Sequence, residues 1–292
     1  MEFITIINSS IKNINFIYLI PFFLFIFIHF IAEPIRWSFY LKKSKNPLSN
    51  AIGHIFFLTA FLSYLLPMKL GLPIRIGLLK KKLKLKIKTI SKFLLLDGIL
   101  YYGSWISIAC IAGFNLLSKF KNTIELSIIT SIILIVTSFL IFILFFIKIK
   151  KYKDKISTIK PYTIYSSLNK RIISSLLFIT YTDITSHILR HWALLGMVGY
   201  MLPIEQIFVI TAISIFTGLI SMMPMGLGGY DITIVLLLTQ ASVPLEIAIL
   251  VPIFNRMGTI FISIIFGLRA AYYLSINPFK LERIRKDLTE TD

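Results

Sequence analysis

Residues 220–231 read Ile-Ser-Met-Met-Pro-Met-Gly-Leu-Gly-Gly-Tyr-Asp, a turn-forming stretch that ends in an acid. The apolar stretches that adjoin it, residues 204–223 and 232–238, have the composition of lipid-facing helices. Irregular backbone at membrane depth is tolerated only where it is buried in protein or lines a wet cavity. We therefore predict a broken helical hairpin here, and we expect it to carry a binding or transport site.

The composition is that of an integral membrane protein. Hydrophobic residues make up 57% of the 292 residues, charged residues only 15%, and the mean hydropathy is +0.83. These values predict an all-α, polytopic membrane helix bundle that forms a single domain over residues 1–292. No polar stretch is long enough for a separate catalytic domain. The one cysteine, Cys110, excludes an internal disulfide and a thiolate metal cluster.

The formal net charge of +18 is distributed over short loops, which is a topology signal rather than a nucleic-acid signal. The lysine-rich loop at residues 80–88 would also attract anionic lipid headgroups. We therefore expect the membrane itself, and not a nucleic acid, to be the partner. The cell membrane is the expected location.

A membrane-spanning helix needs roughly 20 apolar residues. Five segments meet this requirement, namely residues 16–40, 93–114, 124–147, 172–200 and 247–274. Two other apolar regions, residues 52–79 and 204–241, are interrupted by proline and glycine, and we predict that each is a re-entrant hairpin.

Keeping the basic loops in the cytoplasm gives an outside N-terminus, an inside C-terminus and one hairpin entering from each face. That arrangement is typical of transporters with inverted repeats, so we expect such a repeat. The alternative is that both arms of each hairpin cross the membrane.

The glycines of the late motif, Gly226, Gly228 and Gly229, allow a tight turn and leave backbone amides accessible to a ligand. A helix that begins near Ile232 would direct its first amides toward that turn, where an anion such as phosphate could bind. Asp231 would either contribute to the site or cap this helix.

Two cations, Lys69 and Arg75, lie where the first hairpin is broken. Arginine can bind a phosphate through two donors, whereas lysine acts as a point charge. The alternative is that both side chains extend to the cytoplasmic interface.

The predicted span at 172–200 carries a polar stripe. Asp183, His187, Arg190 and His191 are spaced by four, three and one residues, so they share one face of a helix. Charged groups at mid-bilayer are costly, so this face must contact protein or water. Asp183 could form a structural ion pair, or the stripe could contact a lipid headgroup. The two histidines lack an obvious third ligand, so we expect no metal site.

Three further ionisable residues lie in or beside predicted spans. Asp97 and Arg256 are each alone on their helices, and we expect them to pair across helices, with each other or with Asp231. Arg36, at the end of the first span, is interpreted as a membrane anchor or a headgroup contact.

The chain resembles the lysylphosphatidylglycerol synthase transmembrane family of flippase-like proteins. The matching residues are Arg36, Pro67, Gly71, Arg75, Pro224, Gly226, Gly228, Asp231 and Arg256. Leu72 replaces the acid that is usual in the early motif, Ser63 its frequent asparagine, and Asp231 the usual glutamate of the late motif. Because no aminoacyltransferase domain is recognisable, the resemblance implies lipid handling without lipid aminoacylation.

Our leading hypothesis is a carrier that moves an anionic phospholipid or a polyprenyl-phosphate-linked substrate between leaflets. The phosphate would be bound by the amides of residues 226–229 with Arg75 and Arg256. A membrane-embedded enzyme of lipid-linked sugar or phospholipid metabolism is the alternative, and an accessory subunit of a biosynthetic partner enzyme is a third. No nucleotide motif is present, so we expect no cofactor.

Overall fold

The computed structural model describes residues 14–41, 51–65, 71–119, 170–221 and 228–278, and every regular element in these ranges is a helix. In chain order these elements are the 3-10 helix η1 (Phe16–Tyr18), α2 (Leu19–Leu41), α3 (Ala51–Leu65), α4 (Gly71–Leu83), α5 (Ile87–Lys119), α8 (Lys170–Met197), α9 (Ile204–Ile220), α10 (Gly229–Gln240) and α11 (Leu245–Leu274). The prediction of an all-α membrane bundle is confirmed.

Three helices are long and apolar enough to cross a membrane, at Phe16–Leu41, Ile87–Cys110 and Leu245–Leu274. They correspond to the first, second and last of the predicted spans. Hydrophobic side chains cover the lipid-facing surfaces of these helices, and the polar groups described below lie on their inner faces.

The remaining two predicted spans have different outcomes. Residues 124–147 lie outside the described residues. The span predicted at 172–200 falls largely within α8, whose 28 residues are sufficient to cross a bilayer. α8 is not among the apolar candidates because its polar stripe lowers its hydropathy. That stripe faces protein, since Asp183, Arg190 and His191 are all buried.

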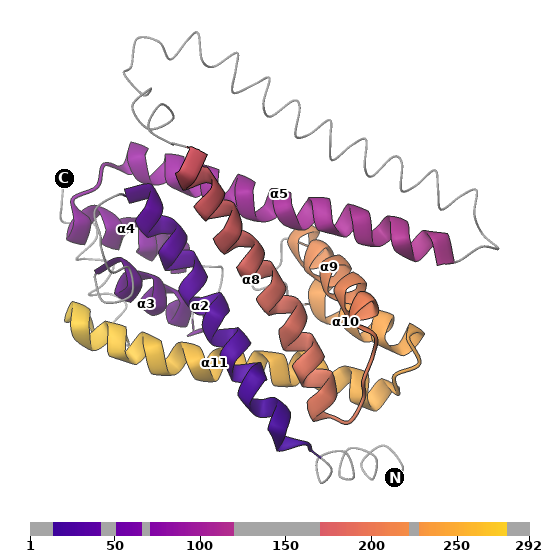
Figure 1. The fold of residues 1–292 in the computed structure, drawn as a ribbon. Helices are drawn as coiled ribbons and strands as arrows, with labels where there is room; N and C mark the ends of the chain where they lie inside the picture. Colours follow the sequence, from indigo (N-terminus) through magenta and orange to yellow (C-terminus); the bar gives the residue numbers. More distant parts are fainter. Residues whose placement is uncertain (1–13, 42–50, 66–70, 120–169, 222–227, 279–292) are drawn as a thin grey trace.

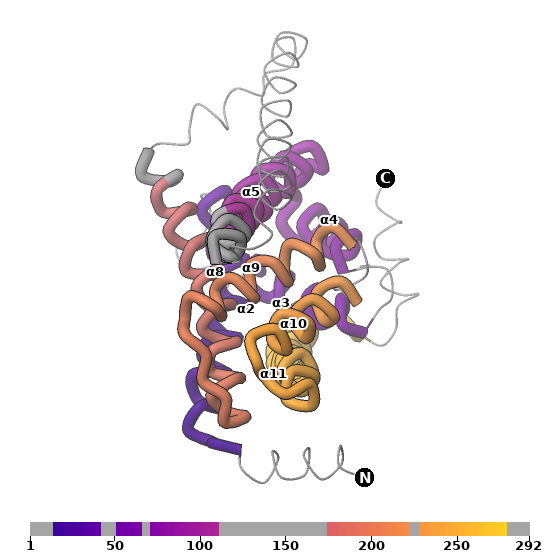
Figure 2. The backbone as a smooth tube through the Cα atoms, turned by 90° about the vertical axis from the view of Figure 1, so that its right-hand side faces the viewer, coloured from indigo at the N-terminus to yellow at the C-terminus, as the bar shows by residue number. Residues whose placement is uncertain are grey.

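Both predicted hairpins are pairs of short helices that pack against each other, α3 with α4 and α9 with α10. Their helices have 15, 13, 17 and 12 residues. At about 1.5 Å per residue, even the longest is shorter than the roughly 30 Å hydrocarbon core. The two pairs lie at opposite ends of the bundle, with α3 and α4 at one end and α9 and α10 at the other (Figure 1), and the view from the second end has α9 and α10 in front of α3 (Figure 2). Their entry from opposite faces of a membrane stays a prediction.

Contacts between helix ends give the bundle two distinct poles. The amide of Asn15 donates to the carbonyl of Met197 over 3.0 Å, which joins the start of α2 to the end of α8. The ammonium of Lys82 donates to the carbonyl of Leu274 over 3.2 Å, which joins the end of α4 to the end of α11. This pairing of ends agrees with the predicted topology, in which the first pole is outside and the second is cytoplasmic.

Glycines allow α11 to approach its neighbours closely. A Cβ on Gly258 would lie 2.5 Å from the ring of Phe22 in α2, and one on Gly267 would collide with Phe61 in α3. Small residues at such crossings are the usual means of packing helices in lipid, where no hydrophobic driving force operates between them. The result is a closely packed frame of α2, α3, α8 and α11 around a polar interior.

Candidate functional site

A cavity of about 420 Å³ lies in the polar interior of the bundle. Helices α2, α3, α5, α8, α9, α10 and α11 all contribute residues to its wall. Two of those residues, Arg190 of α8 and Arg256 of α11, carry guanidinium groups. The cavity is therefore a concave site with apolar walls and a small number of strong hydrogen-bond donors, which is the usual form of a binding site.

The two hairpins meet at this cavity. Ser63 and Tyr64, near the end of α3, line it from one side, and Gly218 and Leu219, near the end of α9, line it from the other. Tyr230, in the first turn of α10, also contributes to the wall. The predicted convergence of the two hairpins on one polar site thus agrees with the positions of these residues.

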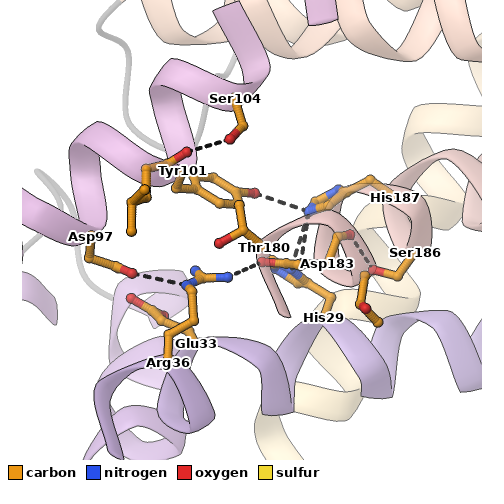
Figure 3. Close-up of polar contacts among 12 residues, drawn as sticks. His29, Glu33, Arg36, Asp97, Tyr101, Ser104, Thr180, Asp183, Ser186 and His187 are labelled. Carbon is orange, nitrogen blue, oxygen red and sulfur yellow. Dashed lines mark hydrogen bonds and ion pairs between the residues drawn. The ribbon is translucent and has the colours of Figure 1, made fainter. Parts of the chain in front are cut away.

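Arg36 is the centre of a buried ionic cluster (Figure 3). Its Nε donates to Asp97 of α5 over 2.9 Å, and its Nη1 donates to Asp183 of α8 over 2.8 Å. Its guanidinium also lies 5.1 Å from the ring centroid of Tyr101. The side chain is only 3% exposed, so Arg36 is a cross-link between three helices rather than a membrane anchor or an accessible headgroup ligand.

A chain of hydrogen-bonding groups extends from this cluster to the cavity (Figure 3). His29 Nδ1 lies 2.7 Å from Asp183 Oδ1 and 3.1 Å from His187 Nε2. His187 Nε2 is 3.3 Å from the hydroxyl of Tyr101, and its Nδ1 is 2.9 Å from Arg190 Nη2. The polar stripe of α8 is therefore one face of a network that also includes α2 and α5.

Arg190 differs from the other buried arginines in having no acidic partner. Among the described residues, no carboxylate lies within ion-pair distance of it, and its Nε has no hydrogen-bond partner. The residue is 4% exposed. A buried guanidinium without an ion-pair partner is costly, and on the cavity wall Arg190 is placed where an anion could contact it.

Arg256 forms a two-point ion pair with Asp231, in agreement with one of the pairings expected from the sequence. The distances are 3.1 Å from Nε to Oδ1 and 2.6 Å from Nη2 to Oδ2. Asp231 lies in the first turn of α10, where a negative charge is also favourable for the helix dipole. The pair is partly exposed, at 23% and 24%, so an anion in the cavity can compete for Arg256.

Arg75 lies elsewhere. Its Nη1 pairs with Glu33 of α2, and its Nε donates to Thr59 over 3.0 Å. Its guanidinium is 4.2 Å from the ring centroid of Phe56. Arg75 is not among the residues that line the cavity, so the structure does not bring it together with Arg256 as the sequence reasoning expected.

The glycine motif is described in part. Gly228 has a φ of 87°, a conformation that favours glycine, and it precedes the first turn of α10. Gly229 packs tightly, since a Cβ there would lie 2.7 Å from Ser221. The first amides of α10 have no carbonyl partner within the helix, as the anion hypothesis requires. Gly226 and Lys69 lie outside the described residues.

His29, Asp183 and His187 each bring one metal-ligating atom within 4.8 Å of the others. A neutral histidine that binds a metal through Nε2 keeps its proton on Nδ1. Here Arg190 donates to the Nδ1 of His187, and Arg36 occupies the second oxygen of Asp183. The donor set therefore fits a hydrogen-bonded network better than a metal site.

Sequence reasoning assigned no role to several wall residues, namely His29, Tyr64, Tyr101, Tyr230 and Asn255. The hydroxyl of Tyr230 is 2.5 Å from His191 Nε2 and accepts from Asn255 Nδ2 over 3.2 Å. His29 had a detectable signal, because it shares the face of Glu33 and Arg36 at helical spacing. The tyrosines had none, since aromatic residues are frequent throughout the chain.

A comparison with protein-family models matches residues 4–267 to the lysylphosphatidylglycerol synthase TM region. No curated protein and no solved structure matches the chain. The match includes every described residue that lines the cavity or joins the polar network. It agrees with the early and late motifs, with the all-helical fold and with the apolar spans. The chain therefore belongs to the lysylphosphatidylglycerol synthase transmembrane-region family of membrane proteins.

Proposed function

We propose that this protein is a flippase-like carrier that binds the phosphate group of an anionic lipid in the central cavity and moves the lipid between leaflets. The lipid is a phospholipid or a polyprenyl-phosphate-linked molecule. The phosphate contacts Arg190 and Arg256, and the acyl or prenyl chains remain in the surrounding bilayer. The protein works as a multi-pass protein of the cell membrane, with a biosynthetic enzyme that supplies its substrate.

The observation that carries this proposal is the buried guanidinium of Arg190 on the wall of the cavity, which has no carboxylate partner among the described residues. Arg36 uses two carboxylates, those of Asp97 and Asp183, which leaves Arg190 without one. A phosphate is the complementary ligand, because a guanidinium binds it with charge-assisted hydrogen bonds.

The size of the cavity supports a headgroup rather than a whole lipid. A volume of about 420 Å³ is in the range of pockets for small polar molecules. Two long hydrocarbon chains do not fit in such a volume. The ends of both hairpins form part of the wall, so movement of either hairpin would change access to the site from one side.

The alternative of an embedded enzyme is less well supported by the contacts of the acids. A catalytic base must be free to take a proton from the substrate. Asp97 and Asp183 are held by Arg36, and Asp231 is held by Arg256. Each candidate base is therefore already engaged with a guanidinium.

Leaflet exchange of a labelled anionic lipid in reconstituted liposomes tests the proposal. We expect exchange by the wild type, and strong loss of exchange in Arg190→Met and Arg256→Ala. The matched control is Arg269→Ala, since Arg269 is an exposed arginine on the same helix as Arg256. Exchange that is equal in all four proteins, or absent from the wild type, contradicts the proposal. Formation of a new covalent lipid product would favour the enzyme.

A further inference from the structure

We propose that His187, supported by His29, is a proton-binding site that is filled when the headgroup binds, so that the carrier moves a proton together with its lipid. This inference rests on the proposed function and adds the coupled ion. It is carried by the position of Arg190, which bonds to His187 and lines the same cavity as the two histidines.

In the empty site, Arg190 prevents His187 from taking a second proton. A guanidinium can only donate hydrogen bonds, so the Nδ1 of His187 accepts from Arg190 over 2.9 Å. The proton of the neutral imidazole is then on Nε2, which faces Tyr101 at 3.3 Å. Both ring nitrogens are occupied, and the imidazolium cannot form while Arg190 keeps this contact.

A bound phosphate removes that obstacle. A guanidinium is attracted more strongly to an anion than to a neutral imidazole, because the two opposite charges attract, so Arg190 turns from the imidazole to the phosphate. The Nδ1 of His187 is then free to bind a proton from the solution. His29 adjoins the site, because its Nδ1, which donates to the carboxylate of Asp183 over 2.7 Å, lies 3.1 Å from His187 Nε2.

Charge balance explains why anion and proton bind together. Arg36 and Arg190 balance Asp97 and Asp183, so the network has no formal charge when the imidazoles are neutral. A phosphodiester adds one negative charge to a site that is largely removed from water. A proton on the histidine pair cancels that charge, and an unbalanced buried charge is costly.

The titratable and charged groups of the network and cavity wall around His187 have opposing effects. They are Asp183, Arg190 and His191 on α8, His29, Glu33 and Arg36 on α2, Tyr64 on α3, Asp97 and Tyr101 on α5, Tyr230 on α10 and Arg256 on α11. The three arginines nearest the cavity oppose an added positive charge, and Asp183 favours it. Neutralisation of Arg190 by the bound phosphate shifts the balance toward proton uptake.

Calorimetry can measure the proton directly. A short-chain phosphatidylglycerol is titrated into the full chain in detergent, in buffers of different ionisation enthalpy, at a pH slightly above neutrality, where free imidazole is mostly uncharged. We expect about one proton taken up per lipid by the wild type. His187→Gln and His29→Gln should bind lipid more weakly, with proton uptake per bound lipid reduced toward zero. His54→Gln is the matched control, because His54 packs against Tyr273 and does not line the cavity.

The outcomes separate this inference from the proposed function. Lipid binding by the wild type without proton uptake overturns the inference and leaves the carrier intact. Uptake that persists in both histidine variants assigns the proton to another group and also overturns it. If the wild type binds no lipid, the proposed function and the inference both fail. The wild-type measurement decides the question even where a variant does not fold.

Discussion

Arg36 and Arg190 are two buried arginines of the same network, and we predict opposite consequences when each is replaced by methionine. Methionine keeps most of the aliphatic volume and removes the charge. Arg36 is bonded to two carboxylates, whereas Arg190 is bonded to a neutral imidazole and leaves its own Nε unpaired. The comparison therefore separates a structural cation from a ligand-binding one.

Arg36→Met should reduce the free energy of unfolding severely. Removing one partner of a buried ion pair costs about 3–5 kcal/mol, because the remaining charge has no compensation. Here Asp97 loses its guanidinium partner and Asp183 keeps only His29 as a hydrogen-bond partner, and the two acids are 8% and 1% exposed. We expect a loss at the upper end of that range, or a chain that does not fold.

Arg190→Met should lower the unfolding free energy by no more than about 1 kcal/mol. The lost hydrogen bond to His187 contributes about 1 kcal/mol, and removal of the unpaired Nε relieves a penalty of about 1–3 kcal/mol. Lipid binding should weaken instead. One charge-assisted hydrogen bond to the phosphate contributes about 1.5–3 kcal/mol, which corresponds to a roughly tenfold to hundredfold rise in Kd.

Denaturant unfolding in detergent micelles and titration with a short-chain phosphatidylglycerol measure the two quantities on the same preparations. The reasoning is refuted if Arg190→Met is as unstable as Arg36→Met while its lipid affinity is unchanged. It is also refuted if Arg36→Met is fully stable, since the two carboxylates would then not depend on the guanidinium.

Three other predictions concern packing, pairing and topology. Gly258→Ala should lower stability by about 1–3 kcal/mol through overpacking, because its Cβ would meet Phe22. Gly103→Ala, whose Cβ would have no atom within 4 Å, should instead raise stability by up to about 1 kcal/mol through helix propensity. Unfolding in micelles compares the two variants, and equal effects would contradict this account. Asp231→Asn should lower stability by about 1 kcal/mol, because it removes a partly exposed ion pair and a favourable charge at the start of α10. Asp231→Glu is the control and should keep the stability of the wild type. In a variant without the native cysteine, Lys86→Cys should react with an impermeant thiol reagent only from the cytoplasmic side and Met201→Cys only from outside, and labelling from one common side would refute the topology.

The sequence was sufficient to predict the broken helices because proline and glycine interrupt otherwise apolar runs. It was also sufficient to predict that the polar stripe on α8 faces protein or water and not lipid, since the cost of its charges in lipid is too large. The pairing of Arg256 with Asp231 was one of two options, and only the crossing of α10 and α11 decides between them.

Other parts of the site depend on three-dimensional packing that no local pattern encodes. Arg75 pairs with Glu33, so an acid on α2 takes the place of the acid that Leu72 replaces in the early motif. Arg36 lies near a helix end in the sequence, yet α5 and α8 cover it completely. We infer the role of Arg190 from its lack of an acidic partner, and this lack can be recognised only when the positions of its described neighbours are known.

The shortness of the paired helices has a consequence for the energy barrier to lipid movement. If each pair enters from its own face, a phosphate that reaches the cavity between the ends of α3 and α9 has crossed only part of the hydrocarbon thickness. The protein would then divide one long passage through the hydrocarbon core into two shorter passages, with a charged binding site between them. Small displacements of one pair at a time would suffice for passage, and no large rotation of the whole bundle would be required.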